Sequence, residues 1–170
     1  MHLEGRARVL GDDVNTDYII SSTRKRETID PHVLKRHLLE TVDPDFATTV
    51  RAGDIVVAGR NFGCGSAMEV AVTVPLAAGI SAVVARSFAR TYYRNAINNG
   101  LVPVECDTTG IREGDRLAID IGERALTVRN ETRDTTVTAL MLPPHMLRIL
   151  AAGGLVPYFR EHHGFAAVGG

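Results

Sequence analysis

A strand–helix–strand–helix–strand pattern in the centre of the chain constrains its fold more than any other feature of the sequence. Short apolar runs rich in β-branched residues alternate there with longer helical runs that end at a glycine. The expected strands cover residues 54–59, 81–85 and 101–106, and the expected helices cover residues 68–78 and 87–99. Two successive connections of this kind imply parallel strands with right-handed crossovers. We therefore expect an α/β fold built on parallel strands.

The segments on either side of this central unit complete the expected fold. Residues 5–10 and 18–20 are expected strands, and residues 21–28 are an expected loop. Asp30 and Pro31 are typical of a helix start, and Val33, Leu34, Leu38 and Val42 would form its apolar stripe. Residues 116–121, 125–129 and 135–139 alternate in polarity like antiparallel strands, and residues 145–152 suit a closing helix. We expect a single domain over residues 1–170, with residues 163–170 as a loose tail.

Composition excludes several classes of protein. The 170 residues are 45% hydrophobic and 23% charged, as in ordinary soluble domains, and the net charge of −1 gives no basic face for nucleic acid. No apolar run reaches membrane-spanning length and the first residues lack an apolar signal core, so we expect no membrane partner. Cys64 and Cys106 make neither a disulfide framework nor a metal set, and His162 and His163 lack a third ligand. We expect no metal site in this chain and a cytoplasmic setting.

A glycine-rich turn joins the expected strand 54–59 to the expected helix 68–78. Gly63 and Gly65 allow a ligand to approach the backbone closely, and they leave amide N–H groups exposed near a helix start. Such donors suit a carboxylate or a phosphate. Ser66 either caps the helix or presents its hydroxyl to the ligand. The spacing matches neither nucleotide-binding glycine motif, so a simple tight turn with a serine cap is the alternative interpretation.

Two groups of cations stand near this turn in the expected fold. Three consecutive cations at residues 24–26 either form a solvated surface or reach over the anion site. Arg86, Arg90 and Arg94 follow the expected strand 81–85. Arg90 and Arg94 are four residues apart and share a helix face, so they are either solvated or close to the ligand-binding edge of a parallel sheet.

Five motifs, in order along the chain, match a known family. They are DVNTD at residues 13–17, GRNFGCGS at 59–66, ARSFAR at 85–90, YRNAINNGL at 93–101 and GGLVPY at 153–158. This set resembles the small subunit of 3-isopropylmalate dehydratase, which corresponds to the swivelling domain of aconitase. The short length and the GGLVPY ending are similar to the compact form that also serves homoaconitases and dimethylmalate dehydratase. The resemblance implies a swivelling β/β/α domain with a mixed, mainly parallel sheet or barrel and a small antiparallel C-terminal section.

The resemblance also implies a function. It implies a two-chain hydro-lyase whose large partner subunit carries a [4Fe-4S] cluster, while this chain holds no cofactor and can form a homo-oligomer when isolated. The substrate would be a small hydroxy-carboxylate such as 3-isopropylmalate. By motif, Ser66 is the catalytic base that removes a proton alpha to a carboxylate. The implied substrate-binding residues are Thr16, Asp17, Arg24, Lys25, Arg26, Asn61, Gly63, Cys64 and Gly65.

Three positions depart from the family pattern after the glycine turn. Ala67, Met68 and Val70 stand where the resembling family has a serine, an arginine and a histidine. A missing arginine removes a charge-assisted carboxylate pair of about 1.5–3 kcal/mol. The cations at residues 24–26 are the expected substitutes, and Met68 either reflects a different substrate, such as dimethylmalate, or simply packs. A degenerate paralogue and a stand-alone anion-binding module are the alternative functions.

Overall fold

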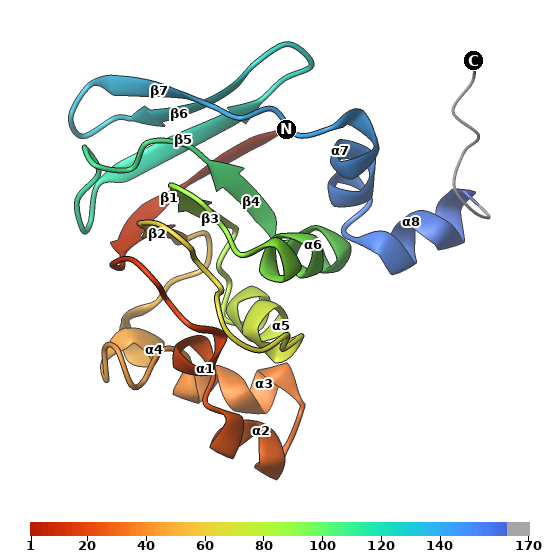
Figure 1. Ribbon diagram of the computed structural model, residues 1–170. Helices are drawn as coiled ribbons and strands as arrows, with labels where there is room; N and C mark the ends of the chain where they lie inside the picture. Colours follow the sequence, from red (N-terminus) through yellow and green to blue (C-terminus); the bar gives the residue numbers. More distant parts are fainter. Residues whose placement is uncertain (163–170) are drawn as a thin grey trace.

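The computed structural model describes residues 1–162 and is organised around one seven-stranded sheet (Figure 1). The strands are β1 (His2–Val9), β2 (Ile55–Ala58), β3 (Ala82–Ala85), β4 (Val102–Glu105), β5 (Arg116–Ile121), β6 (Leu126–Asn130) and β7 (Thr135–Ala139). The helices are α1 (Thr16–Ile19), α2 (Ser22–Glu27), α3 (Pro31–Leu34), the 3₁₀ turn η1 (Lys35–His37), α4 (Phe46–Thr49), α5 (Val70–Ala77), α6 (Arg90–Asn99), α7 (Pro144–Ala151) and α8 (Leu155–His162).

The sheet has a parallel half and an antiparallel half that meet at β1. The strand order is β4-β3-β2-β1-β5-β6-β7. Strands β1 to β4 pair in parallel, because the helical crossovers return the chain to the same end of the sheet. Strands β1, β5, β6 and β7 pair antiparallel, with short turns joining β5 to β6 and β6 to β7. The expected α/β class with a mixed sheet is confirmed, and the antiparallel part contributes as many strand pairings as the parallel part.

Side-chain alternation along the parallel strands fills two separate cores. In β2, Val56 and Ala58 face the core formed with α1, α3 and α5, whereas Ile55 and Val57 face the core formed with β5, β6, α7 and α8. All four residues of β2 are buried, as is usual for a parallel strand covered on both faces. The sheet curls, and the amide of Leu140 just after β7 donates to the carbonyl of Glu105 in β4. The two ends of the sheet therefore approach each other around the second core (Figure 1).

Two sequence predictions near the N-terminus were wrong in element type. Residues 18–20 were expected as a strand but belong mostly to helix α1, whose start is capped when the Asn15 side chain accepts a hydrogen bond from the Asp17 amide. The expected loop at 21–28 contains helix α2, which Ser21 caps in the same way. Ile19 and Ile20 are buried as an apolar run should be, but three residues are too few to separate a strand from one helical turn.

The helix after the glycine turn begins later than expected. Its first residue is Val70 rather than Met68, and its N-cap position is Glu69, which makes no side-chain capping bond. Ser66 therefore does not cap α5, which leaves its hydroxyl free for another role. The helix opened by Asp30 also ends early, at Leu34, and Val42, expected in its stripe, is 45% exposed.

Helix α8 includes His162, whose ring stacks on Tyr158 with the centroids 4.4 Å apart. The predicted loose tail at residues 163–170 lies outside the described residues. None of the helices in residues 1–162 has the length and apolar character needed to cross a membrane.

Candidate active site

The loops that follow the first three parallel strands come together at one edge of the sheet. Residues 14–17 follow β1, residues 59–68 follow β2 and residues 86–89 follow β3. Isolated parallel bridges join Asn15 to Cys64 and Phe62 to Phe88, so the three loops form one layer. This edge is the carboxyl end of the parallel strands, where ligands of open α/β sheets bind.

Ser66 lies at a small cavity in this layer. The cavity has a volume of about 90 Å³ and is lined by Thr16, Gly63, Gly65, Ser66, Ala67, Met68, Ala89, Arg90, Thr91, Tyr92 and Asn95. Ser66 is exposed, and its hydroxyl makes no hydrogen bond to another described residue. The buried Thr16 hydroxyl donates to the Ser66 carbonyl at 2.8 Å and so fixes the backbone on which the serine stands. The Ser66 backbone is therefore held in place, while its hydroxyl has no hydrogen-bond partner among the described residues.

The backbone of the glycine turn has a shape that only glycine tolerates well. Gly63 and Gly65 have φ values of 79° and 93°, in the left-handed region. A Cβ at Gly63 would strike the Tyr92 ring, and one at Gly65 would strike the Asn15 side chain. The amides of residues 65–68 donate no hydrogen bond to any described residue. These N–H groups, beside the Ser66 hydroxyl, form a donor set suited to an oxyanion or a carboxylate.

The amino end of helix α6 forms the opposite wall of the cavity. Tyr92 is completely buried there, its hydroxyl donates to the Ala71 carbonyl at 3.2 Å, and burial raises the pKa of this phenol far above its ordinary value of 10. Its ring packs edge-on against Phe62, with centroids 5.1 Å apart. Tyr92 is thus a neutral, rigid support that braces the glycine turn rather than a proton donor or acceptor.

Comparison with known proteins identifies the family. Residues 17–109 match the family model described as "Aconitase C-terminal domain". The chain belongs to the aconitase C-terminal domain family. The 3-isopropylmalate dehydratase small subunit of Moorella thermoacetica is 47% identical over 160 residues, which cover 93% of this chain and 95% of that protein. The methanogen homoaconitase small subunit of Methanocaldococcus jannaschii is 44% identical, over 95% of this chain and 93% of its own length.

A solved structure shows the same fold. The crystal structure of 3-isopropylmalate dehydratase from Methanocaldococcus jannaschii superposes with a TM-score of 0.90 and 42% sequence identity, over 96% of each chain. The resemblance predicted from the five motifs is confirmed. Relatives with two different names in this family show about the same identity to this chain, so overall identity does not distinguish their substrates.

Only some of the predicted site residues of this aconitase-family chain lie at the Ser66 cavity. Thr16, Gly63, Gly65 and Ser66 line it together. Cys64 supplies only its backbone to this layer, since its carbonyl accepts a hydrogen bond from the Thr16 amide at 2.8 Å. It is half-buried and does not line the cavity.

Two further predicted residues have structural hydrogen bonds near the cavity. The Asn61 side chain donates to the Asp13 carboxylate at 2.9 Å, which holds a residue with a φ of 57° in place. Asp17 accepts a hydrogen bond from the Ser22 amide at 2.7 Å and so ties α1 to the start of α2. Both residues order the layer around the cavity.

The three cations of helix α2 do not line the cavity. The Arg24 guanidinium donates to Glu40 at 2.9 Å and lies 3.7 Å from Glu27. The hydrogen bond that Arg24 donates to Glu40 raises the pKa of Arg24. Burial alone would raise the pKa of Glu40, but the hydrogen bonds from Arg24 and His37 lower it. Lys25 lines a separate hollow of about 310 Å³ together with Glu69. Arg26 is exposed. Arg24 is thus already paired within the chain.

Three functional candidates were underestimated from the sequence. Arg90, Thr91 and Asn95 line the cavity from α6. The sequence left Arg90 open between a solvated position and one close to the ligand-binding edge of the sheet, and it presented Asn95 only as part of a motif. The available indication was position, because Arg90 follows the loop at the carboxyl end of β3, the same sheet edge as Ser66.

The donor set of this chain does not fit an iron–sulfur cluster. Among residues 1–162 there is no group of three or more His, Cys, Asp or Glu side chains placed to hold a metal. The two cysteines lie on different segments, and burial raises the pKa of the Cys106 thiol to about 11, which keeps it protonated.

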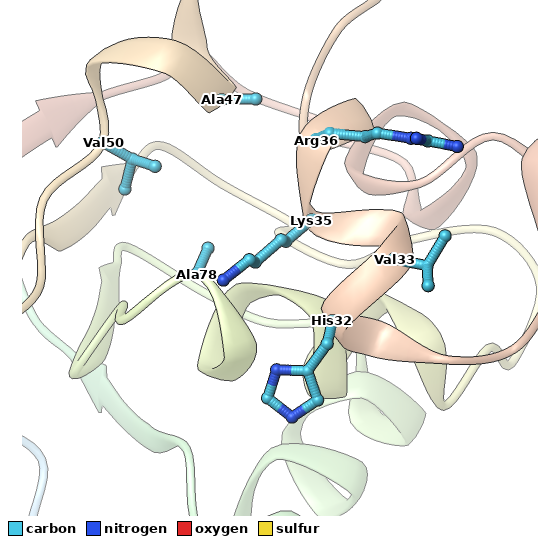
Figure 2. A pocket seen from close by; sticks show the side chains of 7 residues that line it. All are labelled: His32, Val33, Lys35, Arg36, Ala47, Val50 and Ala78. Atoms are coloured by element: carbon cyan, nitrogen blue, oxygen red, sulfur yellow. The ribbon is translucent and has the colours of Figure 1, made fainter.

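A larger hollow lies elsewhere on the chain, and Figure 2 shows its lining. It has a volume of about 520 Å³ and lies between α3, η1, α4 and the end of α5, with Lys35 reaching toward Ala78. It shares no lining residue with the Ser66 cavity. It contains three basic side chains, His32, Lys35 and Arg36, but neither the glycine turn nor Ser66, and we assign it no catalytic role.

Proposed function

We propose that this chain is the small subunit of a two-chain hydro-lyase that removes water from, or adds it to, a hydroxy di- or tricarboxylic acid. The single observation that carries the proposal is the Ser66 hydroxyl beside backbone amides in a cavity of this family's fold, none of them hydrogen-bonded to another residue among 1–162. The names of its relatives suggest 3-isopropylmalate or the homoaconitase substrate. The expected setting is the cytoplasm.

In this proposal, the Ser66 oxygen takes the proton on the carbon alpha to a substrate carboxylate. The C–H electron pair becomes the new C=C bond, and the hydroxyl on the neighbouring carbon leaves as water after it gains a proton. A serine hydroxyl is a weak base at its ordinary pKa, so the reactive alkoxide needs local positive potential. The amides of residues 65–68 and the amino end of α6 provide that potential.

The cavity size supports a site completed by another chain. A volume of about 90 Å³ accommodates roughly three water molecules, which is enough for one carboxylate and its alpha carbon. The rest of a di- or tricarboxylic acid must therefore lie outside this chain's cavity. A large subunit carrying an iron–sulfur cluster would hold that remainder and act as the Lewis acid toward the leaving hydroxyl.

The proposal is tested by purifying the chain with its large subunit and assaying 3-isopropylmalate, dimethylmalate and homoaconitate. We expect Ser66→Ala to reduce turnover by about 10²–10⁴-fold while the complex still assembles. Ser81→Ala is the matched control, because Ser81 precedes β3 at the opposite edge of the sheet and bonds the Gly53 carbonyl. Full turnover in Ser66→Ala would remove Ser66 from the mechanism.

Two outcomes separate this proposal from the other functions considered. A chain that assembles with a large subunit but turns over none of these acids would be a degenerate paralogue. A chain that binds a carboxylate and never associates with an iron–sulfur protein would be a stand-alone anion-binding module.

A further inference from the structure

We propose that Arg90, assisted by Asn95, is the residue pair of this chain that binds a substrate carboxylate beside Ser66. This inference deepens the proposed function and rests on it. The first observation is that Arg90 is the only charged side chain among the described residues that line the Ser66 cavity. The lining of this cavity therefore offers a carboxylate one cationic residue and no acidic residue.

None of the other candidate cations, Arg26 included, is among the described residues that line this cavity. Met68 lines it without a charge, is only 5% exposed and packs into the hydrophobic core. Arg24 is already held by Glu40 and Glu27, and Lys25 lines a different hollow. The substitution of basic residues 24–26 for an arginine at position 68, which the sequence suggested, is thus not favoured by the geometry of this chain.

Arg90 itself is free to bind a ligand. It is exposed and forms no ion pair with any residue among 1–162. The guanidinium can donate two parallel hydrogen bonds to one carboxylate. The Asn95 side chain, half-buried and five residues further along α6, lines the same cavity and makes no hydrogen bond to another described residue. Its amide adds a neutral donor to the same site.

The position of Arg90 is unfavourable for helix stability, which also indicates a functional role. Arg90 is the first residue of α6, and the first turn of this helix contains no acidic residue. A cation at a helix amino terminus faces the positive end of the helix dipole. A bound carboxylate would offset both positive groups at once. Violations of a local stability rule of this kind are expected at functional sites.

The chemistry of the proposed reaction gives Arg90 a specific role. Removal of the alpha proton places negative charge on the adjacent carboxylate as the C–H bond breaks. A guanidinium on that carboxylate stabilises the charge where it develops, so Arg90 would lower the barrier as well as hold the substrate. Its loss should therefore reduce kcat and raise KM together.

The test compares Arg90→Ala with Arg94→Ala in the two-chain enzyme. Arg94 is an exposed arginine one turn along the same helix that does not line the cavity. We expect Arg90→Ala to reduce kcat/KM by about 10- to 100-fold and Arg94→Ala to change it less than twofold. Added guanidinium ion should restore part of the activity of Arg90→Ala. No such rescue is expected if the substitution only damages the structure. Equal activity of the two variants, or no rescue, would overturn the inference.

A binding measurement on the full chain alone decides the inference without turnover. In NMR titrations with malate as the probe, the signals of the Arg90 side-chain Nε–H and of the Ser66 amide should both shift. The malate-induced shift of the Ser66 amide should be lost in Arg90→Ala but kept in Arg94→Ala. A Ser66 shift that survives in Arg90→Ala would show that Arg90 does not hold the carboxylate. If Ser66→Ala abolishes turnover while Arg90→Ala does not reduce it, the proposed function stands and only this inference fails.

Discussion

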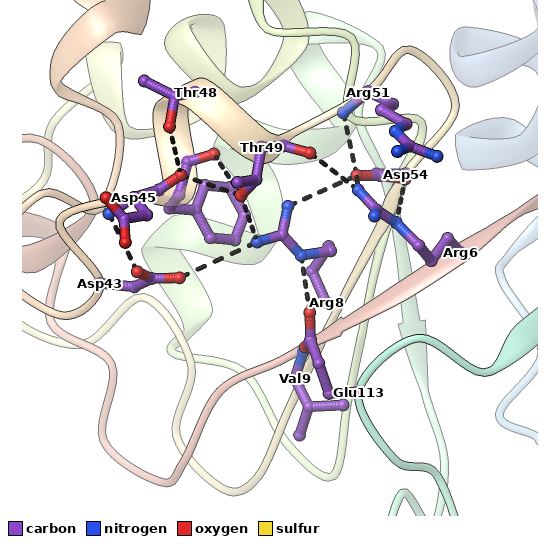
Figure 3. Close-up of polar contacts among 11 residues, drawn as sticks. Arg6, Arg8, Val9, Asp43, Asp45, Thr48, Thr49, Arg51, Asp54 and Glu113 are labelled. Atoms are coloured by element: carbon purple, nitrogen blue, oxygen red, sulfur yellow. Dashed lines mark hydrogen bonds and ion pairs between the residues drawn. The ribbon is translucent and has the colours of Figure 1, made fainter.

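Two arginine sites in this chain use the same side chain for opposite purposes. The first is the buried arginine network (Arg6, Arg8 and Asp54), which joins β1 to β2 and α4 (Figure 3). The second is Arg90 at the Ser66 cavity. Arg8 is 5% exposed and its charge is compensated on several sides, whereas Arg90 is exposed and pairs with no described residue.

The buried network shows what a structural arginine requires. The Arg8 Nε donates to Glu113 at 2.8 Å, its Nη2 donates to Thr49 at 3.0 Å, and its guanidinium stacks over the Phe46 ring at 4.3 Å. Its Nη1 makes no hydrogen bond in the described chain but lies 3.6 Å from Asp54. The Arg6 Nη2 donates a 2.7 Å hydrogen bond to the Asp54 carboxylate, which therefore faces two guanidinium groups. Buried charges persist only when they are paired in this way.

The difference teaches how to separate structural from functional cations in one protein. A cation whose partners are supplied by the chain stabilises the fold and has little capacity left for a ligand. A cation left unpaired beside a reactive hydroxyl and free amides contributes little to folding and is available to substrate. Substitutions at the buried network should therefore change the free energy of unfolding, whereas substitution of Arg90 should change substrate binding and turnover.

The largest expected effect on stability is that of Arg8→Leu. Removing the guanidinium leaves Asp54 buried with one charged partner instead of two, and it removes the hydrogen bond to Thr49. We expect the free energy of unfolding to fall by about 3 kcal/mol, measured by urea denaturation. Arg90→Ala should change it by less than about 0.5 kcal/mol. Similar losses for both variants would break the comparison between the two sites.

A second, somewhat smaller effect is expected for Gly63→Ala. Alanine at a φ of 79° is strained, and its Cβ would strike the buried Tyr92 ring. We expect a loss of about 2 kcal/mol in urea denaturation, together with loss of turnover, because the Ser66 amides would shift. Gly11→Ala is the control, since nothing lies within 4 Å of its added Cβ. If Gly63→Ala keeps the stability and turnover of the native enzyme, the cavity does not depend on this backbone shape.

The smallest effect concerns acid stability of the paired carboxylates. Burial alone would raise the pKa of Asp115, but hydrogen bonds from Arg133, the Arg112 amide and Asn130 lower it to about 2, below its ordinary value of 3.8. As the pH falls, the Asp115 carboxyl of the unfolded chain therefore becomes protonated at a higher pH than that of the folded chain. The contribution, about 1–2 kcal/mol, should be complete above about pH 5 and lost progressively as the pH falls through about 2.

The acid effect is measured by urea denaturation at a series of pH values with Asp115→Asn as the comparison. Asp54 titrates in the same direction, because its bonds from Arg6 and the Arg51 amide lower its pKa against the opposing effect of burial. The variant should lose only the Asp115 part of the pH dependence. Identical pH profiles for the variant and the native chain would contradict the assignment.

Local pattern was a reliable guide where one stretch of sequence suffices. The alternation of β-branched strands and helices predicted β2, β3 and β4 and the parallel half of the sheet, because period and burial are properties of the local sequence. It failed for α1 and α2, which are four and six residues long and owe their starts to the caps Asn15 and Ser21. Such short elements have too few residues to display a period.

From the sequence itself came the order of the central elements and the glycine turn, since both depend on residues that are neighbours in the chain, and the family resemblance of the five motifs added Ser66 as the candidate base. Only the tertiary structure decided which cation shares the serine's cavity. Residues 24–26 were the substitutes expected from the sequence, yet Glu40 pairs Arg24 while the crossover through β3 brings Arg90 to the same sheet edge as Ser66. The charge of a side chain is known from its residue type, but whether that charge is already paired depends on contacts between segments far apart in the chain.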